Sequence, residues 1–420
     1  MKLLLYTILY VLWLTPASAA DEPSLGSNLA ELLDYAREHN LEFAAARYET
    51  DAALQRVQPA GALPDPVFRT ELHDFTNKGT DTPVSLLPNR VNNTYYRVMQ
   101  TVPFWGKRDL KREVAAAEAM QAQGRSSETW VALSARIKKN YAQYYLYAHS
   151  ENLTHELLDL LNNLEQVAQA RYATGLVPQQ DVIRAQVEQT ELRRDLVMVE
   201  TDQHHAMTRL NTLLQRPPYE PLAQPQRLRP LPAADKLAFA VLEDRLKTRN
   251  PQLFTLDAQI TAAEKSRELT MKNRYPDFAF GLAPTQMGGK IREWELMFEL
   301  NIPLQQQSRR SREREADALL SAAQARKEAE ANQLLSDLVE NLLALSAAQR
   351  IEVLTTSSLL PQTETTFQAA LVGYQNGKVD FATLLDAQRQ ILKAKLDVLN
   401  AQVEAQIRLA EIEKLLGEEL

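Results

Sequence analysis

The chain contains no cysteine and little glycine. Its 420 residues include 12 glycines, and its aromatic content is 7%. Without a thiol, disulfide bonds, thiolate metal sites and a lipid anchor on an N-terminal cysteine are excluded. The formal net charge of −7 at pH 7 gives no electrostatic basis for nucleic-acid binding. Scarce glycine beside abundant alanine, leucine, glutamate, glutamine and arginine is typical of long helices and coiled coils.

Long hydrophobic runs are also missing, apart from one at the N-terminus. Lys2 precedes a mostly apolar stretch of 12 residues, Leu3–Leu14, and Ala17–Ala19 then offers the small side chains of a cleavage site. A membrane anchor is the alternative, but crossing a bilayer core takes about 20 residues. We therefore expect residues 1–19 to be a secretory signal peptide, with no transmembrane helix after it.

The rest of the chain repeats itself. The segment Tyr172–Val177 (YATGLV) returns as Tyr374–Val379 (YQNGKV), an offset of 202 residues. Other pairs keep the same order: Asn40 with Asn250, Val102-Pro103-Phe104 with Ile302-Pro303-Leu304, Arg112-Glu113 with Arg312-Glu313, Ala185-Gln186 with Ala387-Gln388, and Leu213-Leu214 with Leu415-Leu416. Such a period is too long for a solenoid. It predicts a first repeat over 20–216 and a second over 236–420, joined by a proline-rich linker at 217–235.

Proline-free stretches predict very long helices. No proline occurs between Pro103 and Pro178, and the interval from Lys107 to Thr174 is rich in good helix formers. One helix over this interval would be on the order of 100 Å long at about 1.5 Å per residue. Helices beyond about 25 residues indicate a coiled coil or a similar rod. Shorter amphipathic helices are predicted over Leu29–Gln58 and Phe239–Lys272.

The segment after each long helix predicts a returning helix. Its apolar seam runs through Val182, Ala185, Gln189, Leu192, Leu196, Val199, Gln203, Ala206, Leu210 and Leu213, and through the same positions shifted by 202. This 3–4 spacing keeps one seam against a partner and predicts left-handed supercoiling. Gly175 and Gly377 suit helix ends, and Asp181 and Asp380 suit capping of the next helix. Each repeat should contain a helical hairpin with a tight tip, which an ordinary bundle would also explain.

Two strand-like segments are predicted in each repeat. In Glu293–Ile302, the apolar residues on one face alternate with polar residues on the other. Such alternation over about ten residues is typical of a membrane β-strand, although a half-buried strand of a soluble sheet is the alternative. The first repeat has a counterpart at Tyr95–Val102. Shorter strands are expected at Val67–Leu72 and Asp277–Leu282, with loops over 74–93 and 283–292.

Four strands are too few for a closed membrane sheet. Open strand edges are not tolerated in lipid, and known membrane barrels begin at about eight strands. If these strands span a membrane, several chains must share them. Three chains would supply 12 strands, and their helices would form a tube on one side of the membrane.

The ordered motifs resemble those of the TolC family of outer-membrane efflux channels, over essentially the whole mature sequence. They are Val102–Arg108 (VPFWGKR), Arg171-Tyr172-x-x-Gly175 with Asp181-Val182, and Gly373-Tyr374-x-x-Gly377 followed by Leu384–Arg389 (LLDAQR). The resemblance implies a mainly α fold with a small β part. Long α-helical hairpins would form a periplasmic α-barrel, and four strands per chain would contribute to a 12-stranded β-barrel of a homotrimer in the outer membrane.

The resemblance also implies a function. It predicts a passive, non-enzymatic channel of a tripartite efflux system in a Gram-negative bacterium, without a cofactor. A periplasmic adaptor (membrane fusion) protein and an inner-membrane pump of the RND type would be its partners. The segment Phe104–Arg108 resembles the heavy-metal efflux branch, which implies cations as cargo. A periplasmic coiled-coil adaptor or scaffold without a barrel is the alternative. No phosphate loop, nucleophile–base pair or metal-ligand cluster is apparent in the sequence.

The resemblance suggests particular site residues. In the family, acidic residues of the second tip constrict the tunnel mouth, and Asp386 matches this position; the alternative is that it only supports its helix. Positions that contact the adaptor and hold the closed state are matched by Arg171, Tyr172, Gly175, Asp181, Tyr374, Gly377 and Asp380, or these residues only shape the turns. On the strand Glu293–Ile302, the residues expected to face lipid are Trp294, Leu296, Phe298 and Leu300. His204 and His205 are neighbours on a helix and are expected to be solvated rather than metal ligands.

Overall fold

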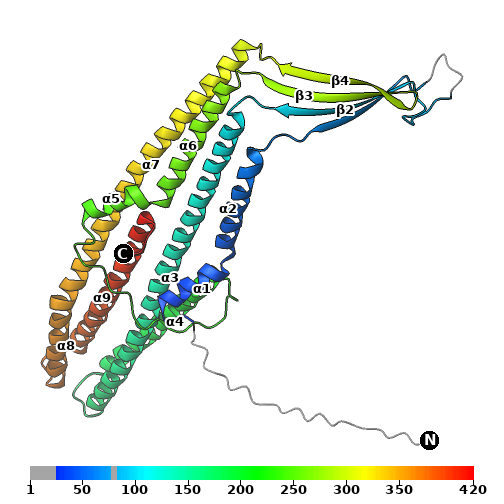
Figure 1. Ribbon diagram of the computed structural model, residues 1–420. Helices are drawn as coiled ribbons and strands as arrows, with labels where there is room; N and C mark the ends of the chain where they lie inside the picture. The colour runs from blue at the N-terminus through cyan, green and yellow to red at the C-terminus, as the bar shows by residue number, and fades with distance from the viewer. Residues whose placement is uncertain (1–24, 77–82) are drawn as a thin grey trace, which may run out of the picture.

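The computed structural model describes residues 25–76 and 83–420, an elongated molecule with long helices side by side and a sheet projecting from one end (Figure 1). The predicted signal peptide lies outside the described residues. The helices are α1 (Leu29–His39), α2 (Leu41–Ala60), α3 (Lys107–Ala173), α4 (Gln179–Leu213), α5 (Phe239–Arg249), α6 (Pro251–Lys272), α7 (Gln306–Leu354), α8 (Leu360–Gln375) and α9 (Phe381–Leu416). The strands are β1 (Val67–His73), β2 (Asn93–Val102), β3 (Asp277–Met287) and β4 (Lys290–Asn301).

The longest helix, α3, confirms the predicted uninterrupted rod. It contains 67 residues and no proline. Its partners change along its length: α2 and α6 flank the half nearer the sheet, and α4 and α9 flank the other half. Gly124 lies where α6 crosses, because a Cβ at this position would collide with Thr255 of α6. A single glycine therefore admits the close approach of a neighbouring helix.

Asparagines divide the two helices predicted over 29–58 and 239–272, so each is in fact a pair. The Asn40 side chain accepts a hydrogen bond from the Phe43 N–H at 3.0 Å and donates one to the Leu213 carbonyl at 2.8 Å. Asn250 does the same with Leu253 at 2.8 Å and Leu415 at 2.7 Å. Each asparagine thus caps one helix at its N-terminus and satisfies a carbonyl at the end of the returning helix.

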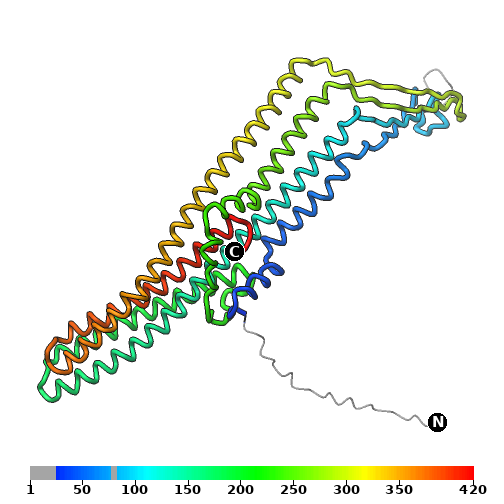
Figure 2. The backbone as a smooth tube through the Cα atoms, turned by 60° about the vertical axis from the view of Figure 1, so that its left-hand side comes forward, coloured from blue at the N-terminus to red at the C-terminus, as the bar shows by residue number. Residues whose placement is uncertain are grey.

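The rising helix of the second repeat contains a π-helical turn. The offset between the repeats is 200 at Arg112 and Arg312 but 202 at Tyr172 and Tyr374, so this stretch holds two extra residues. Between α7 and α8, Thr355–Leu359 forms a π-helix. The wider turn accommodates extra chain length within a continuous helix. The two hairpin tips therefore lie side by side, at the end of the molecule opposite the sheet (Figure 2).

The sheet is antiparallel, with strand order β1-β2-β3-β4. Its central pairing joins the repeats, because β2 and β3 are hydrogen-bonded neighbours. The loop predicted over 283–292 is wrong: β3 and β4 extend through most of it and are joined at Gly288 and Gly289, with φ angles of 56° and 82°. Positive φ at both central residues is what a tight two-residue hairpin turn requires.

Apolar side chains cluster at three main places along the helices. One cluster fills the space between the two hairpins near their tips, where Phe367 and Phe381 meet Leu161. The other two lie halfway along the molecule, where α1 and α5 each pack against the hairpin of their own repeat. None of the helices in the described part of the chain has both the length and the hydropathy of a transmembrane segment.

Candidate functional site: the hairpin tips and the sheet

The two tips share one turn geometry. Gly175 and Gly377 both have a φ of 70°, which favours glycine. The Leu176 N–H donates to the Arg171 carbonyl at 2.9 Å, and the Lys378 N–H donates to the Gly373 carbonyl at 2.8 Å. These bonds close each helix end in the manner of a Schellman motif. The backbone conformation of these turns is therefore sufficient to explain why both positions are glycine.

The first tip is tied to the second by three side chains. The Tyr374 hydroxyl donates to buried Asp181 at 3.3 Å, and the Arg171 guanidinium lies 5.3 Å from the centre of the Tyr374 ring. Arg171 also donates to the Gln375 carbonyl. Burial, followed by the negative charge of Asp181, raises the pKa of Tyr374 to about 12. Tyr374 therefore remains a neutral donor at physiological pH. Tyr172 points outward and is exposed.

The predicted capping role is correct for Asp380 and wrong for Asp181. Asp380 accepts hydrogen bonds from the N–H and the hydroxyl of Thr383, at 2.9 and 2.6 Å. Those bonds lower the pKa of Asp380. In the first repeat the matching position is Pro178, which precedes α4. Asp181 lies one turn later, and its carboxylate is free to accept from Tyr374.

Asp386 lines an open groove between α4 and α9. The groove has a volume of about 530 Å³, and Arg184, Glu188 and Arg389 also line it. Arg389 donates to both carboxylate oxygens of Glu188. Among the described residues, none forms a hydrogen bond or ion pair with Asp386, which is exposed. Arg184 and Asp386, which occupy equivalent positions in the two repeats, thus border the same groove.

An apolar stripe crosses the whole sheet. Leu296 of β4 lies opposite Leu282 of β3, which lies opposite Val98 of β2, and Val98 lies opposite Phe68 of β1. All four side chains are exposed, Leu296 to 86%. The β4 residues Trp294, Phe298 and Leu300 are exposed on the same face. A contiguous apolar surface of this kind needs a partner or a lipid environment.

The opposite face of β4 carries charged side chains, and the two outer strands of the sheet have unpaired backbone groups. Glu293, Glu295 and Glu299 alternate with the apolar residues and are exposed. In the described sheet, β1 and β4 each have one neighbouring strand and therefore one unpaired backbone edge. Such edges are templates for pairing with another chain.

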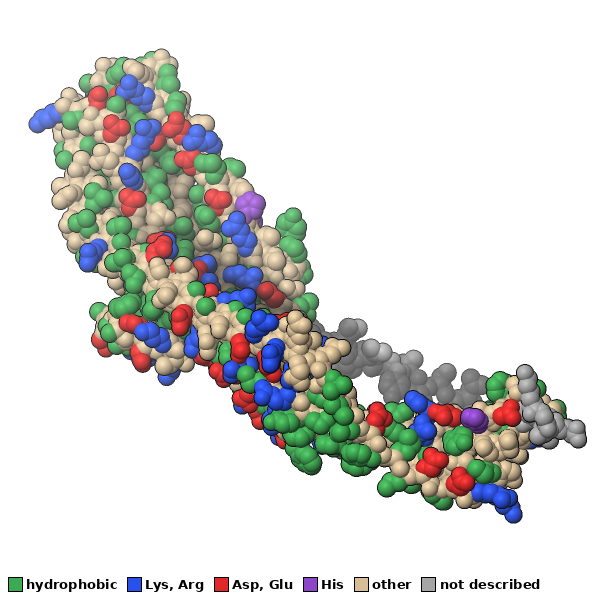
Figure 3. Space-filling model, turned by 90° about the horizontal axis from the view of Figure 1, so that it is seen from above, with side chains coloured by type: hydrophobic (Ala, Val, Ile, Leu, Met, Phe, Trp, Pro, Cys, Tyr) green, Lys and Arg blue, Asp and Glu red, His purple; other side chains and the backbone are tan. Residues whose placement is uncertain are grey.

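Aromatic side chains mark the junction between helices and sheet. Phe104 stacks on Tyr275 with ring centres 4.5 Å apart, and Trp105 lies 5.8 Å from Phe278. Lys107, at the start of α3, is buried and pairs with Asp277 at 2.8 Å. The Val102–Arg108 motif thus anchors the first repeat to the second. Hydrophobic side chains gather on the surface of this region (Figure 3).

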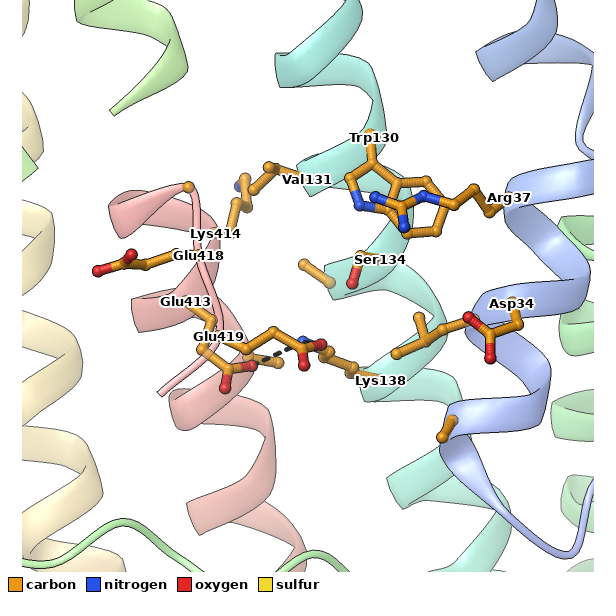
Figure 4. Close-up of a pocket in the computed structure, with 15 residues that line it drawn as sticks. Asp34, Arg37, Trp130, Val131, Ser134, Lys138, Glu413, Lys414, Glu418 and Glu419 are labelled. Carbon is orange, nitrogen blue, oxygen red and sulfur yellow. Dashed lines mark hydrogen bonds and ion pairs between the residues drawn. The ribbon is translucent and has the colours of Figure 1, made fainter. Parts of the chain in front are cut away.

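A buried ionic network lies midway along the molecule, at residues that no local sequence pattern marks as functional. Lys138 of α3 is 5% exposed and donates to Glu413 of α9 at 2.9 Å and to Glu419 at 2.7 Å. Arg229 of the linker donates to both oxygens of Glu413, at 2.9 and 3.0 Å. Figure 4 shows Lys138 reaching these carboxylates beside a cavity of about 320 Å³ between α1, α3 and α9. The network joins the linker and both repeats.

Comparison with known proteins identifies the family. A family model described as outer membrane efflux protein matches residues 32–215 and 242–418. The cobalt-zinc-cadmium resistance protein CzcC of Cupriavidus metallidurans is 22% identical over 393 residues, which cover 93% of this chain and 90% of CzcC.

Solved structures share the fold. The outer-membrane channel OprN has a TM-score of 0.78 at 20% identity, covering 93% of this chain and 89% of OprN. The outer membrane protein VceC from Vibrio cholerae has a TM-score of 0.78 at 17% identity, covering 93% of this chain and 96% of VceC. The predicted resemblance and fold class are confirmed. The family model matches most of both repeats, over residues 32–215 and 242–418, so the chain belongs to the outer membrane efflux protein family.

Proposed function

We propose that the chain is the outer-membrane channel of a tripartite efflux system, a passive conduit from the periplasm or the pump to the outside. One observation carries the proposal: a four-stranded sheet with two open edges and an apolar stripe projects from one end of a bundle of long helices. In lipid, such edges must be paired. Family membership provides the setting, since the matching family consists of outer membrane efflux proteins.

The proposed assembly is a homotrimer. β4 of one chain pairs with β1 of the next, so that three sheets of four strands close into a barrel of 12. Trp294, Leu296, Phe298 and Leu300 then face outer-membrane lipid, and the glutamates of β4 face the lumen. The aromatic junction lies at the membrane interface, where such side chains are favoured. The helices continue as a tunnel in the periplasm.

The proposed partners act at the tips. An adaptor (membrane fusion) protein would contact the exposed tip residues and connect the tunnel to an inner-membrane pump of the RND type. The alternative function, a coiled-coil adaptor or scaffold without a barrel, leaves the apolar stripe of the sheet without any environment that buries it.

Heavy-metal cations are the proposed cargo. The name of the relative CzcC refers to cobalt, zinc and cadmium resistance, and the exposed Glu293, Glu295 and Glu299 would give the lumen a negative lining. A strain that lacks the gene should become sensitive to salts of these metals, and the intact gene should restore growth. If this strain grows normally on metal salts but is sensitive to organic drugs, the cargo would be organic drugs instead.

The channel itself is tested with purified protein. Native mass spectrometry in detergent should give a trimer, and insertion into a planar bilayer should give discrete conductance steps. A monomer that is soluble without detergent and shows no conductance would support the adaptor alternative.

Asp386 is proposed to form the constriction. Three copies around the trimer axis make a ring of carboxylates that attracts cations. Asp386→Asn removes the ring charge at nearly constant size, so the cation preference of the resting pore should fall. The control Glu364→Gln removes an exposed charge from α8 of the same hairpin. If both variants keep wild-type current and selectivity, Asp386 is not part of the gate.

The link between Tyr374 and Asp181 is proposed to hold the closed state. Tyr374→Phe deletes the 3.3 Å hydrogen bond and keeps the ring over Arg171. A loss of about 1 kcal/mol should increase the open-to-closed ratio roughly fivefold. Single-channel recording measures this ratio. Tyr172→Phe, at the exposed tyrosine of the first tip, should leave it unchanged, and an equal effect of both variants would contradict the proposal.

A further inference from the structure

We propose that α3 and α4 hold a divalent-cation site formed by Glu151, His155 and Glu200. One ligand atom of each side chain lies within 4.8 Å of the other two. Within 25–76 and 83–420, this is the one cluster of three or more acidic or histidine side chains with such spacing. It lies partway along the first hairpin, away from the tip residues and from the sheet.

The hairpin brings the three residues together. Glu151 and His155 are four residues apart and project from the same face of α3. Glu200 faces them from α4, which returns along α3. In a tetrahedral zinc site, ligand atoms are about 3.3 Å apart, given bonds of about 2.0–2.1 Å. Small side-chain rotations therefore suffice for three ligands to close on one ion.

The partners of these side chains favour a cation. Gln203 donates to one oxygen of Glu151 at 2.7 Å, which orients the carboxylate and leaves its other oxygen for the metal. Nearer the tip, where α3 also faces α4, the Glu165 carboxylate accepts hydrogen bonds from Gln186 and Gln189. In the described chain, by contrast, no hydrogen bond or ion pair engages the side chain of Glu200 or that of His155. Two carboxylates thus approach an imidazole, and no lysine or arginine of the described residues forms an ion pair with either carboxylate.

The ligand set indicates which ion fits. Imidazole with two carboxylates suits zinc and cobalt, whereas calcium and magnesium prefer ligand sets made only of oxygen. His155 is exposed and the two glutamates are half-buried, so water can complete the coordination. Binding at such an open site is reversible.

The second hairpin lacks this cluster. At the offset of 200 that holds before the π-helix, Glu151 corresponds to Ile351, and at the offset of 202 that holds after it, Glu200 corresponds to Gln402. Gln402 donates to Glu352 at 2.9 Å. Each chain therefore carries one site, which would tie α3 to α4 in one hairpin only. The inference goes beyond the proposed function, because a conduit need not bind its cargo. It would stand even if the cargo were organic.

The first test is calorimetric titration of the full-length protein in detergent with zinc chloride, after removal of any affinity tag. Wild type should bind one equivalent per chain, and His155→Gln and Glu200→Gln should each weaken binding at least about tenfold. The controls Glu156→Gln and His205→Gln remove neighbouring groups and should bind as wild type does. Absence of saturable binding by wild type, or unchanged binding by both site variants, would overturn the proposal.

A second variant gives a direct spectroscopic signal. His155→Cys introduces the only thiol of the chain, since the protein has no cysteine. With added cobalt, a thiolate-to-metal charge-transfer band should appear, because a soft ligand can replace imidazole at the same position. Glu156→Cys should give no band. Folding of both variants is checked by circular dichroism, and folded His155→Cys without the band would refute the site.

Discussion

Replacing Glu413 with glutamine is expected to lower the free energy of unfolding by about 3–5 kcal/mol. The buried Glu413 carboxylate accepts hydrogen bonds from the Lys138 ammonium group and from two nitrogens of the Arg229 guanidinium. A neutral amide would leave the charge of buried Lys138 with the exposed Glu419 as its one remaining ion-pair partner among the described residues. Breaking one member of a buried ionic network costs more than the network contributes as a whole, because uncompensated charge stays buried. Denaturant unfolding in detergent, followed by far-ultraviolet circular dichroism, measures the loss.

Glu419→Gln is the matched control for Glu413→Gln. Glu419 contacts the same lysine at 2.7 Å, but its side chain is 66% exposed. Solvent screens exposed pairs, so this variant should lose less than about 1 kcal/mol. Equal losses in the two variants would mean that burial of Glu413 has no energetic role.

Acidification should reproduce the loss in the wild-type protein. Burial works to raise the pKa of Glu413, but hydrogen bonds and charge from Arg229, with the charge of Lys138, outweigh it and hold this pKa below its ordinary value. A depressed folded pKa contributes stability above the unfolded value of about 4.3, and this stability is lost as pH falls through the folded pKa. Below about pH 4, wild type should therefore lose more stability than Glu413→Gln does.

Phe298→Lys is expected to abolish most of the trimer in the outer membrane. A lysine on the lipid face costs about 2–4 kcal/mol near the bilayer midplane, and a trimer carries three copies. The substitution also removes the ring contact with Phe280, whose centre lies 5.4 Å away. Trimer in the outer-membrane fraction is quantified on native gels.

Two variants separate the effects of charge, ring and face. Phe298→Leu keeps an apolar side chain and should retain most of the trimer. Glu299→Lys places the same charge on the next residue, on the opposite face of β4, so it should assemble and change ion selectivity instead. Normal trimer yield from Phe298→Lys would show that this face does not contact lipid.

Local patterns predicted most of the fold. The proline-free interval before Pro178 indicated α3, and alternation over Glu293–Ile302 indicated β4. The breaks at Asn40 and Asn250 were missed because the apolar spacing continues across them, although each asparagine is a good N-cap. The ends of β3 and β4 lie outside the predicted strands because their polar residues are typical of a loop, although Gly288-Gly289 is a hairpin-turn signal.

Contacts between distant residues could not be predicted in this way. Lys138 and Glu413 are 275 residues apart, and Tyr374 and Asp181 are 193 apart. Their pairing depends on how the hairpins lie against each other, which no local pattern specifies. The tip glycines, by contrast, could be predicted locally, because the repeated segments Tyr172–Val177 and Tyr374–Val379 each place one glycine where a helix ends.

The pairing of β2 with β3 bears on how the chain originated. These strands belong to different repeats, yet they are adjacent in one sheet. The junction inside the chain is therefore of the same kind as the one that we propose between β4 and β1 of neighbouring chains. A half-length ancestor with one pair of strands and one helical hairpin would close the same wall from six copies. Gene duplication and fusion would then have added the covalent linker at 217–235 across every second junction, and allowed the two copies to diverge, as Arg184 and Asp386 have.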